Sequence, residues 1–326
     1  MAAPPARAAA LAMKAEVQVR GQVPAAPSPP STGWLDVAER GSVLGIWFMV
    51  AVCRLLGRRV GRLLVRPLVL YFVAFAPTAR RASRAYLQRL GLPHGTRAVL
   101  AHCRRFANCT LDRLFWSLGE TQRFEVTSTG SEHLRALAAE RRGALLVGAH
   151  LGSFEAMRGM ATRGALPLNI VGYFKNARLI NGVLEKLNPG TKTRVLAVEP
   201  GVDFVLRLKE RIEAGELVAL LADRVGLGDR VVEAKLFGER VSLPAGPYWL
   251  AATLGCPVYL TFGLFHEPNR YHLYCEPFAE RVVLPRGARE EGARGYAERF
   301  AARLEYYCRL APDNWFNFYD FWRSPA

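Results

Sequence analysis

Hydrophobic and polar positions divide the chain into a leader, a short apolar and basic segment, and a long regular region. Residues 1–32 are rich in alanine and proline and contain no continuous apolar run. Such a composition buries too little surface to offset the entropy of ordering, so we expect this leader to be disordered. The lack of an apolar central run also argues against a secretory signal.

Residues 33–77 combine apolar runs with regularly spaced arginines. The run 43–53 is shorter than the roughly 20 residues that span a bilayer. The arginines recur at every fourth position and drift around one face of a helix, with leucines opposite. They are Arg54, Arg58, Arg62 and Arg66. A basic amphipathic helix of this kind is typical of a segment in the membrane interface, and a helical hairpin packed on the protein core is the alternative.

Residues 78–326 are expected to form one domain. Short apolar runs, such as 144–149 and 217–221, alternate with stretches of helical periodicity, such as 203–214 and 290–309. This alternation predicts an α/β fold, with a sheet that has helices on both faces.

Charge and cysteine usage narrow the possible partners. The net charge of +16, from 44 basic and 28 acidic residues, indicates an acidic partner such as nucleic acid, anionic lipid or an acidic carrier protein. The six cysteines form no CxxC pair, so we expect buried, reduced thiols and no metal site. Neither a phosphate-binding glycine loop nor a Gly-x-Ser-x-Gly elbow occurs, which leaves no support for a nucleotide cofactor or a serine hydrolase.

His150 and Glu155 are the candidate catalytic residues. We expect His150 to end a buried strand, Gly152 to turn the chain, and Glu155 to lie in the first turn of the next helix. The Glu155 carboxylate would then bond one imidazole nitrogen and leave the other as a general base. The alternative is that Ser153 caps the helix and Glu155 is a favourable charge at its N-terminus, which leaves His150 unexplained.

The His-x4-acid motif after an apolar strand resembles the glycerolipid and lysophospholipid acyltransferase superfamily. Its bacterial lipid A late acyltransferase branch, the lauroyl and myristoyl transferases, is the more similar one. Further blocks resemble that branch in the same order, at residues 172–176, 220–224, 236–238, 244–247 and 312–315. The resemblance covers roughly residues 40–320 and implies a mixed sheet flanked by helices. The Glu-Gly-Thr of phospholipid-making members is missing, which disfavours a lysophosphatidate acceptor.

The resemblance implies transfer of a fatty acyl group from an acyl-carrier-protein thioester, or from acyl-CoA, to a hydroxyl of a lipid or glycolipid. His150 would be the general base, Glu155 would orient its ring, and no metal or other cofactor would be needed. Backbone N–H groups of Gly152 and Ser153 at the helix start are the expected oxyanion donors.

The expected substrate-binding residues follow the matching blocks. They are Gly152, Ser153, Lys175, Asn176, Asp223, Arg224, Phe237 and Gly238. Arg224 is expected to bind phosphate or headgroup oxygens bidentately. A surface ion pair between Asp223 and Arg224 is the alternative.

The expected partners are anionic membrane lipids, acyl carrier protein and a lipid or glycolipid acceptor, with no nucleic acid. The expected location is the cytoplasmic face of the bacterial inner membrane. Two rival functions remain open: a non-catalytic basic protein that binds membranes or nucleic acid, and a lipid hydrolase or thioesterase that uses the same pair of residues with water.

Overall fold

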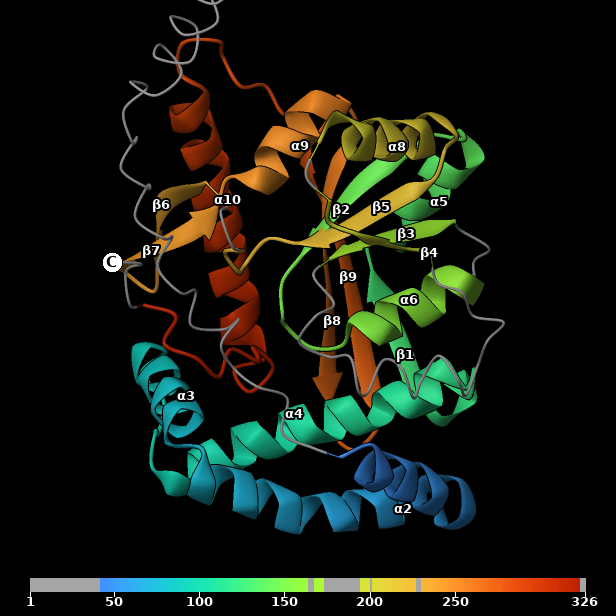
Figure 1. The fold of residues 1–326 in the computed structure, drawn as a ribbon, viewed down its shortest axis with the longest axis vertical. Helices are drawn as coiled ribbons and strands as arrows, with labels where there is room; N and C mark the ends of the chain where they lie inside the picture. The colour runs from blue at the N-terminus through green and yellow to red at the C-terminus, as the bar shows by residue number, and fades with distance from the viewer. Residues whose placement is uncertain (1–41, 164–166, 173–193, 200, 227–229, 323–326) are drawn as a thin grey trace, which may run out of the picture.

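A mixed sheet flanked by helices forms the centre of the protein (Figure 1). The structure is a computed structural model that describes residues 42–163, 167–172, 194–199, 201–226 and 230–322. Within these ranges a seven-stranded sheet stands beside a two-stranded hairpin. The α/β fold with a mixed sheet is therefore confirmed. The expected leader, residues 1–32, lies outside the described residues.

The order across the large sheet is β1-β9-β8-β2-β5-β3-β4. Its strands are β1 (Glu125–Thr129), β2 (Ala144–Gly148), β3 (Leu168–Gly172), β4 (Arg194–Ala197), β5 (Leu217–Leu221), β8 (Val258–His266) and β9 (Arg270–Ala279). β8, β2, β5, β3 and β4 run parallel, whereas β9 is antiparallel to β8 and pairs in parallel with β1. Because β2 and β5 are parallel neighbours, the residues that follow them meet at one edge of the sheet.

Helices cover both faces and one end of this sheet (Figure 1). They are α2 (Val43–Phe75), α3 (Pro77–Arg89), α4 (Thr96–Ser117), α5 (Ser131–Ala139), α6 (Phe154–Arg163), α8 (Val202–Glu213), α9 (Gly246–Leu254) and α10 (Arg289–Leu310). A short 3₁₀ turn, η1 (Thr121–Arg123), precedes β1, and the hairpin of β6 (Val231–Leu236) and β7 (Glu239–Pro244) packs on α10. α4 crosses the lower end of β8 and β9 in Figure 1, and α2 lies along α4.

Two of the regularly spaced arginines face the protein, so the prediction of one basic outer face on this segment was wrong. Asp112 of α4 is fully buried and binds the Arg58 guanidinium through two hydrogen bonds of 2.6 Å. The same carboxylate lies 3.5 Å from Arg62 and accepts a 2.8 Å hydrogen bond from the Tyr271 hydroxyl. The physical reason is Gly57, whose φ of +82° interrupts the helix and breaks the periodicity between its two halves.

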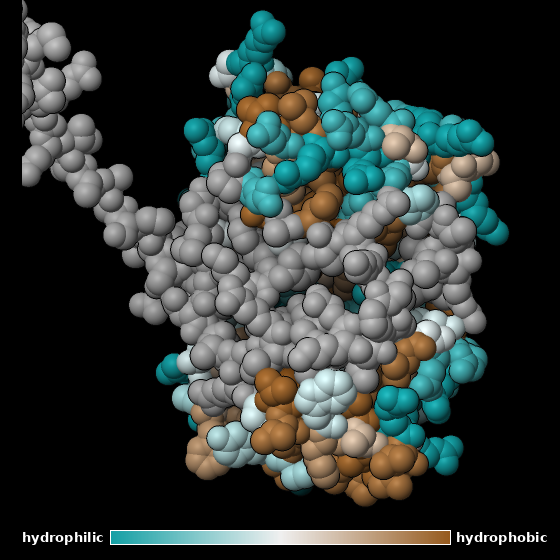
Figure 2. Space-filling model, turned by 45° about the vertical axis from the view of Figure 1, so that its right-hand side comes forward, coloured by the Kyte–Doolittle hydropathy of each residue, from teal (hydrophilic) through white to brown (hydrophobic). Residues whose placement is uncertain are grey.

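The outer face of α2 is mainly apolar. Its exposed large hydrophobic residues are Val43, Leu44, Phe48, Leu55, Leu56, Leu63, Leu68, Leu70, Tyr71 and Phe75. Figure 2 shows apolar residues gathered at the lower end of the molecule, where α2 lies in Figure 1. Arg54, Arg59 and Arg66 are exposed as well. In the described part of the chain no single helix has the length and apolar composition to cross a membrane. The pair α2 and α3 has both when taken together, but the two helices are bent by 93° relative to each other.

Candidate functional site

His150 stands two residues after the end of β2, where the chain turns away from the sheet. Gly152 makes the turn with a φ of +74°, and a Cβ there would lie 2.0 Å from the backbone oxygen of Gly263. Only glycine fits such a position. Gly152 pairs with Gly263 of β8, and Leu151 pairs with Trp315 near the C-terminus. These contacts fix the turn and leave the His150 side chain 30% exposed.

Asp223, two residues after the end of β5, is the carboxylate that meets the imidazole. Its Oδ1 lies 2.8 Å from Nδ1 of His150, and its Oδ2 accepts the backbone N–H of His150 at 3.0 Å. The Asp223 side chain is fully buried. The parallel pairing of β2 with β5 therefore brings together two residues that are 73 positions apart.

The electrostatics of this pair favour a neutral imidazole beside a charged carboxylate. Burial, and then the nearby Arg224 guanidinium, lower the pKa of His150, and the attraction of Asp223 offsets only part of that shift. Burial raises the pKa of Asp223, but His150, Arg224 and the Trp315 hydrogen bond outweigh it and hold this pKa well below its usual range. An ionised carboxylate only accepts, so Nδ1 carries the proton and Nε2 keeps its lone pair.

Glu155 has the expected position in the chain fold but not the expected partner. It lies in the first turn of α6, as the sequence predicts, but its carboxylate pairs with Arg113 of α4 at 2.5 Å. Helix α6 packs against α4, which directs Glu155 toward that helix. The expected contact between Glu155 and the imidazole is thus replaced by the contact with Asp223.

The expected oxyanion donors already have partners. The N–H of Gly152 donates to the Asn314 oxygen at 2.8 Å, and the N–H of Ser153 donates to the Gly263 oxygen at 2.7 Å. The buried Ser153 hydroxyl accepts the N–H of Ala156 at 3.1 Å, so Ser153 caps α6. The expectation that these two N–H groups hold the oxyanion is therefore wrong for this structure, in which Gly152 and Ser153 shape the turn. Contact of either residue with substrate stays a prediction.

Arg224 is held by the C-terminal segment. Its Nε donates to Oδ1 of Asn317 and its Nη2 donates to the Phe316 oxygen, both at 2.9 Å. Its guanidinium also lies 5.6 Å from the centre of the Tyr319 ring. A bidentate clamp on phosphate uses two parallel N–H groups, and the Nε–Nη2 edge is already occupied. A phosphate therefore cannot be clamped through that edge in this structure, and binding of substrate oxygens by the rest of the guanidinium stays a prediction. Its bonds to Asn317 and Phe316 also show that Arg224 does more than form a surface ion pair with Asp223.

The remaining candidates separate into two groups. Lys175 and Asn176 lie outside the described residues. Phe237 and Gly238 form the two-residue turn between β6 and β7, with φ of +53° and +82°. The Phe237 ring lies 6.3 Å from that of Trp315, so Phe237 packs behind the residues around Asp223.

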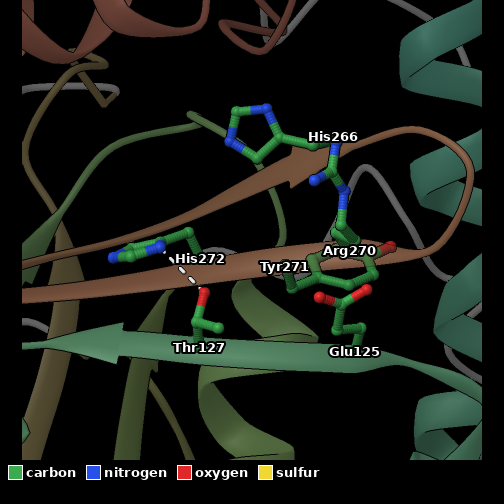
Figure 3. Close-up of a pocket in the computed structure, with 6 residues that line it drawn as sticks. All are labelled: Glu125, Thr127, His266, Arg270, Tyr271 and His272. Atoms are coloured by element: carbon green, nitrogen blue, oxygen red, sulfur yellow. Dashed lines mark hydrogen bonds between the residues drawn. The ribbon is translucent and has the colours of Figure 1, made fainter.

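A polar hollow is formed by β1, β8 and β9, toward the edge of the sheet that is farther from β5 (Figure 3). Its volume is about 270 Å³ and its lining residues are Glu125, Thr127, His266, Arg270, Tyr271 and His272. Both ring nitrogens of His272 lie 2.8 Å from threonine hydroxyls, those of Thr127 and Thr129. The hollow mixes acidic and basic groups and contains none of the residues expected to act in catalysis.

Within the described ranges, the cysteines and the potential metal ligands lie apart from any cluster that could add to the site. All six cysteines are unpaired and buried, as the sequence predicts. Among the described residues no group of three or more histidine, cysteine and acidic side chains has an arrangement suited to a metal ion.

Comparison with known proteins gives the family. A search of curated proteins returned no match. A family profile described as bacterial lipid A biosynthesis acyltransferase matches residues 112–324, which include His150, Asp223, Arg224 and Trp315. This match favours an enzyme over a non-catalytic basic protein. The chain therefore belongs to the bacterial lipid A biosynthesis acyltransferase family.

Proposed function

We propose that this acyltransferase moves a fatty acyl group from a thioester of acyl carrier protein, or of coenzyme A, to a hydroxyl of a lipid A precursor or related glycolipid. The observation that carries the proposal is the pairing of His150 with Asp223. It fixes one imidazole nitrogen and leaves Nε2 with a lone pair on a partly exposed side chain. The family match supports the reaction class.

In the proposed reaction, Nε2 of His150 takes the proton from the acceptor hydroxyl as the hydroxyl oxygen attacks the thioester carbonyl carbon. Asp223 stabilises the imidazolium that forms. The tetrahedral intermediate collapses, the carbon–sulfur bond breaks, and the imidazolium returns its proton to the leaving thiolate. The products are an ester and a free thiol, and no covalent enzyme intermediate is required.

In this proposal, Glu155 acts by holding the start of α6 in place. Its ion pair with Arg113 ties the first turn of α6 to α4, and α6 begins four residues after His150. We propose that this tie fixes the turn that carries the imidazole. Glu155→Gln is then expected to reduce turnover by loosening the turn, without direct loss of the imidazole's hydrogen-bond partner.

The membrane and the carrier protein are the proposed partners. The outer face of α2 exposes leucine, phenylalanine and tyrosine side chains beside Arg54, Arg59 and Arg66. Apolar side chains next to arginines suit the interface of an anionic bilayer. We propose that α2 lies in this interface on the cytoplasmic side of the inner membrane. The net charge of +16 would also attract an acidic carrier protein.

The test is the purified His150→Ala enzyme with acyl-carrier-protein and acyl-CoA donors and a lipid A precursor in mixed micelles. We expect turnover to fall by about 10²–10⁴-fold, the contribution typical of a general base. His94→Ala is the matched control, because His94 is exposed on the loop after α3. Wild-type turnover of His150→Ala would refute the proposal, and release of free fatty acid in place of the acylated lipid would identify a hydrolase.

A further inference from the structure

Residues 314–317 form a clamp around the strand end that carries His150. On one side, the Asn314 oxygen accepts the Gly152 N–H at 2.8 Å. On the other side, the Phe316 N–H donates to the His150 oxygen at 2.8 Å. The Asn314 side chain in turn donates to and accepts from the backbone of Phe265 in β8, at 3.1 and 2.7 Å. The backbone of this segment is thereby fixed relative to the imidazole.

The Trp315 indole is fully buried and points its N–H at Asp223. Nε1 donates to Oδ2 of Asp223 at 3.1 Å. The ring packs against those of Tyr86, Phe321 and Trp322, with centroid separations of 5.0, 4.8 and 5.9 Å. These rings enclose the indole, and its N–H meets the carboxylate.

The Asn317 amide adds a second donor from the same segment. Its Nδ2 lies 3.3 Å from Oδ2 of Asp223, and its Oδ1 accepts the Nε–H of Arg224 at 2.9 Å. Arg224 only donates, so it fixes which end of the amide faces the carboxylate. Asn317 is 3% exposed, so water does not compete strongly for these bonds.

The two carboxylate oxygens of Asp223 have different partners. Oδ2 receives the N–H groups of Trp315, Asn317 and the His150 backbone, whereas Oδ1 meets Nδ1 of the imidazole. We propose that Trp315 and Asn317 are positioning residues: their side-chain N–H groups hold Oδ2, so that Oδ1 stays on Nδ1 and Nε2 faces the substrate. This inference rests on the proposed function of His150 as the base.

The first test is Trp315→Phe, which keeps an aromatic ring and removes the N–H. We expect kcat to fall by about tenfold, the equivalent of one modest hydrogen bond in the transition state, with KM for donor and acceptor unchanged. Trp322→Phe is the matched control. Trp322 belongs to the same aromatic cluster, and its buried Nε1 has no hydrogen-bond partner in the described structure. Its kcat should equal that of the wild type.

The second test detects the hydrogen bond between His150 and Asp223 directly and does not depend on enzyme activity. In enzyme labelled with ¹⁵N-histidine, the proton on Nδ1 of His150 should give a downfield signal, assigned by its loss in His150→Gln. We expect Trp315→Phe and Asn317→Leu to shift or broaden this signal and Trp322→Phe to leave it in place. Melting curves of all variants show whether each remains folded.

The outcomes separate the inference from the proposed function. Unchanged kcat and an unchanged Nδ1 signal in Trp315→Phe would overturn the positioning role, and so would an equal loss of kcat in Trp322→Phe. If instead His150→Ala keeps full turnover, the proposed function fails, yet the Nδ1 signal still decides whether Trp315 and Asn317 hold Asp223.

Discussion

Two buried aspartates, Asp112 and Asp223, are both fully inaccessible to solvent but serve different partners. Asp112 binds the guanidinium groups of Arg58 and Arg62, which remain charged at all ordinary pH values. Asp223 binds an imidazole, a group that can gain and lose a proton near neutral pH. The first carboxylate can only hold α2 on α4, whereas the second can support a change of charge.

The comparison shows that burial alone does not identify a catalytic carboxylate. Both aspartates also accept a hydrogen bond from an aromatic side chain, Tyr271 in one case and Trp315 in the other. What distinguishes Asp223 is a titratable partner that is itself partly exposed. The predictions below therefore expect loss of activity at one aspartate and loss of stability at the other.

The largest effect is expected for Asp223→Asn. The amide keeps the shape of the side chain but removes the charge that stabilises the imidazolium, so turnover should fall by about 10²–10⁴-fold. Steady-state acyl transfer at saturating donor and acceptor measures this. Turnover within a few-fold of wild type would mean that Asp223 is as structural as Asp112.

Asp112→Asn should act on stability. It leaves two guanidinium groups, 13% and 16% exposed, without their counter-charge, and the cost of breaking a buried pair is about 3–5 kcal/mol. Urea unfolding in detergent measures this change in the free energy of unfolding. Turnover per folded molecule should stay close to that of the wild type. A variant with full stability but little turnover would give Asp112 a place in the chemistry.

His102 lies on α4, the helix that also carries Asp112, and it contacts Trp315, the residue that donates to Asp223. It should make the free energy of unfolding depend on pH. Its ring contacts the Ser83 hydroxyl and the Trp315 oxygen, and burial lowers its pKa to about 4. Below pH 6.5 the His102 ring binds a proton in the unfolded chain but stays neutral in the folded chain. The free energy of unfolding should therefore decrease as pH falls from 6.5 to 4. The expected loss is about 3 kcal/mol at the lower end.

The measurement for His102 is the free energy of unfolding across this pH range in wild type and His102→Gln. Glutamine does not titrate, so the variant should show a shallower slope. His150 contributes in the same direction, since its pKa is also lowered, and some slope should remain. Identical slopes in the two proteins would contradict the burial of a neutral His102.

The smallest effect is expected at the outer face of α2. Changing Arg54, Arg59 or Arg66 to Gln should weaken binding to anionic vesicles by about 1 kcal/mol for each arginine. The matched control is Arg58→Gln, because Arg58 points at Asp112 and should contribute little to lipid binding. Flotation at low and high salt measures both. Equal losses for inner and outer arginines would refute the assignment of the two faces.

The strands could be predicted from the sequence because buried parallel strands are uninterrupted apolar runs. β2 and β5 follow that pattern, and His150 and Asp223 each lie two residues beyond the end of one of them. The rule that ligands bind at the carboxyl ends of such strands placed both residues at one edge of the sheet. The identity of each residue's partner was not predictable in the same way.

Spacing favoured Glu155 because it is near His150 in sequence, but the contact was made by Asp223, 73 residues away. Which strands become neighbours depends on long-range packing that local periodicity does not encode. The donors Trp315 and Asn317 lie 92 and 94 residues beyond Asp223 and were missed as parts of the site for the same reason. Only the matching block at 312–315 pointed toward them.

The inward arginines were missed for a different reason. A helical wheel assumes one continuous helix, and the positive φ at Gly57 breaks that assumption. Once the two halves of α2 are treated separately, Arg58 and Arg62 can face Asp112 while leucines on both halves face outward. The signal available in the sequence was Gly57, a glycine inside an apolar and basic stretch, where a helix can be interrupted.

The most direct test of the central claim is a ¹⁵N titration of the His150 ring in the wild type, Asp223→Asn and Glu155→Gln. The claim is that Asp223, and not Glu155, holds the imidazole. We expect the wild type to show a neutral ring protonated at Nδ1, with its pKa lowered from the ordinary value of histidine by burial. Asp223→Asn should change both the tautomer and the pKa, and Glu155→Gln should preserve the Nδ1–H tautomer. A ring that is unchanged in Asp223→Asn but altered in Glu155→Gln would contradict the account.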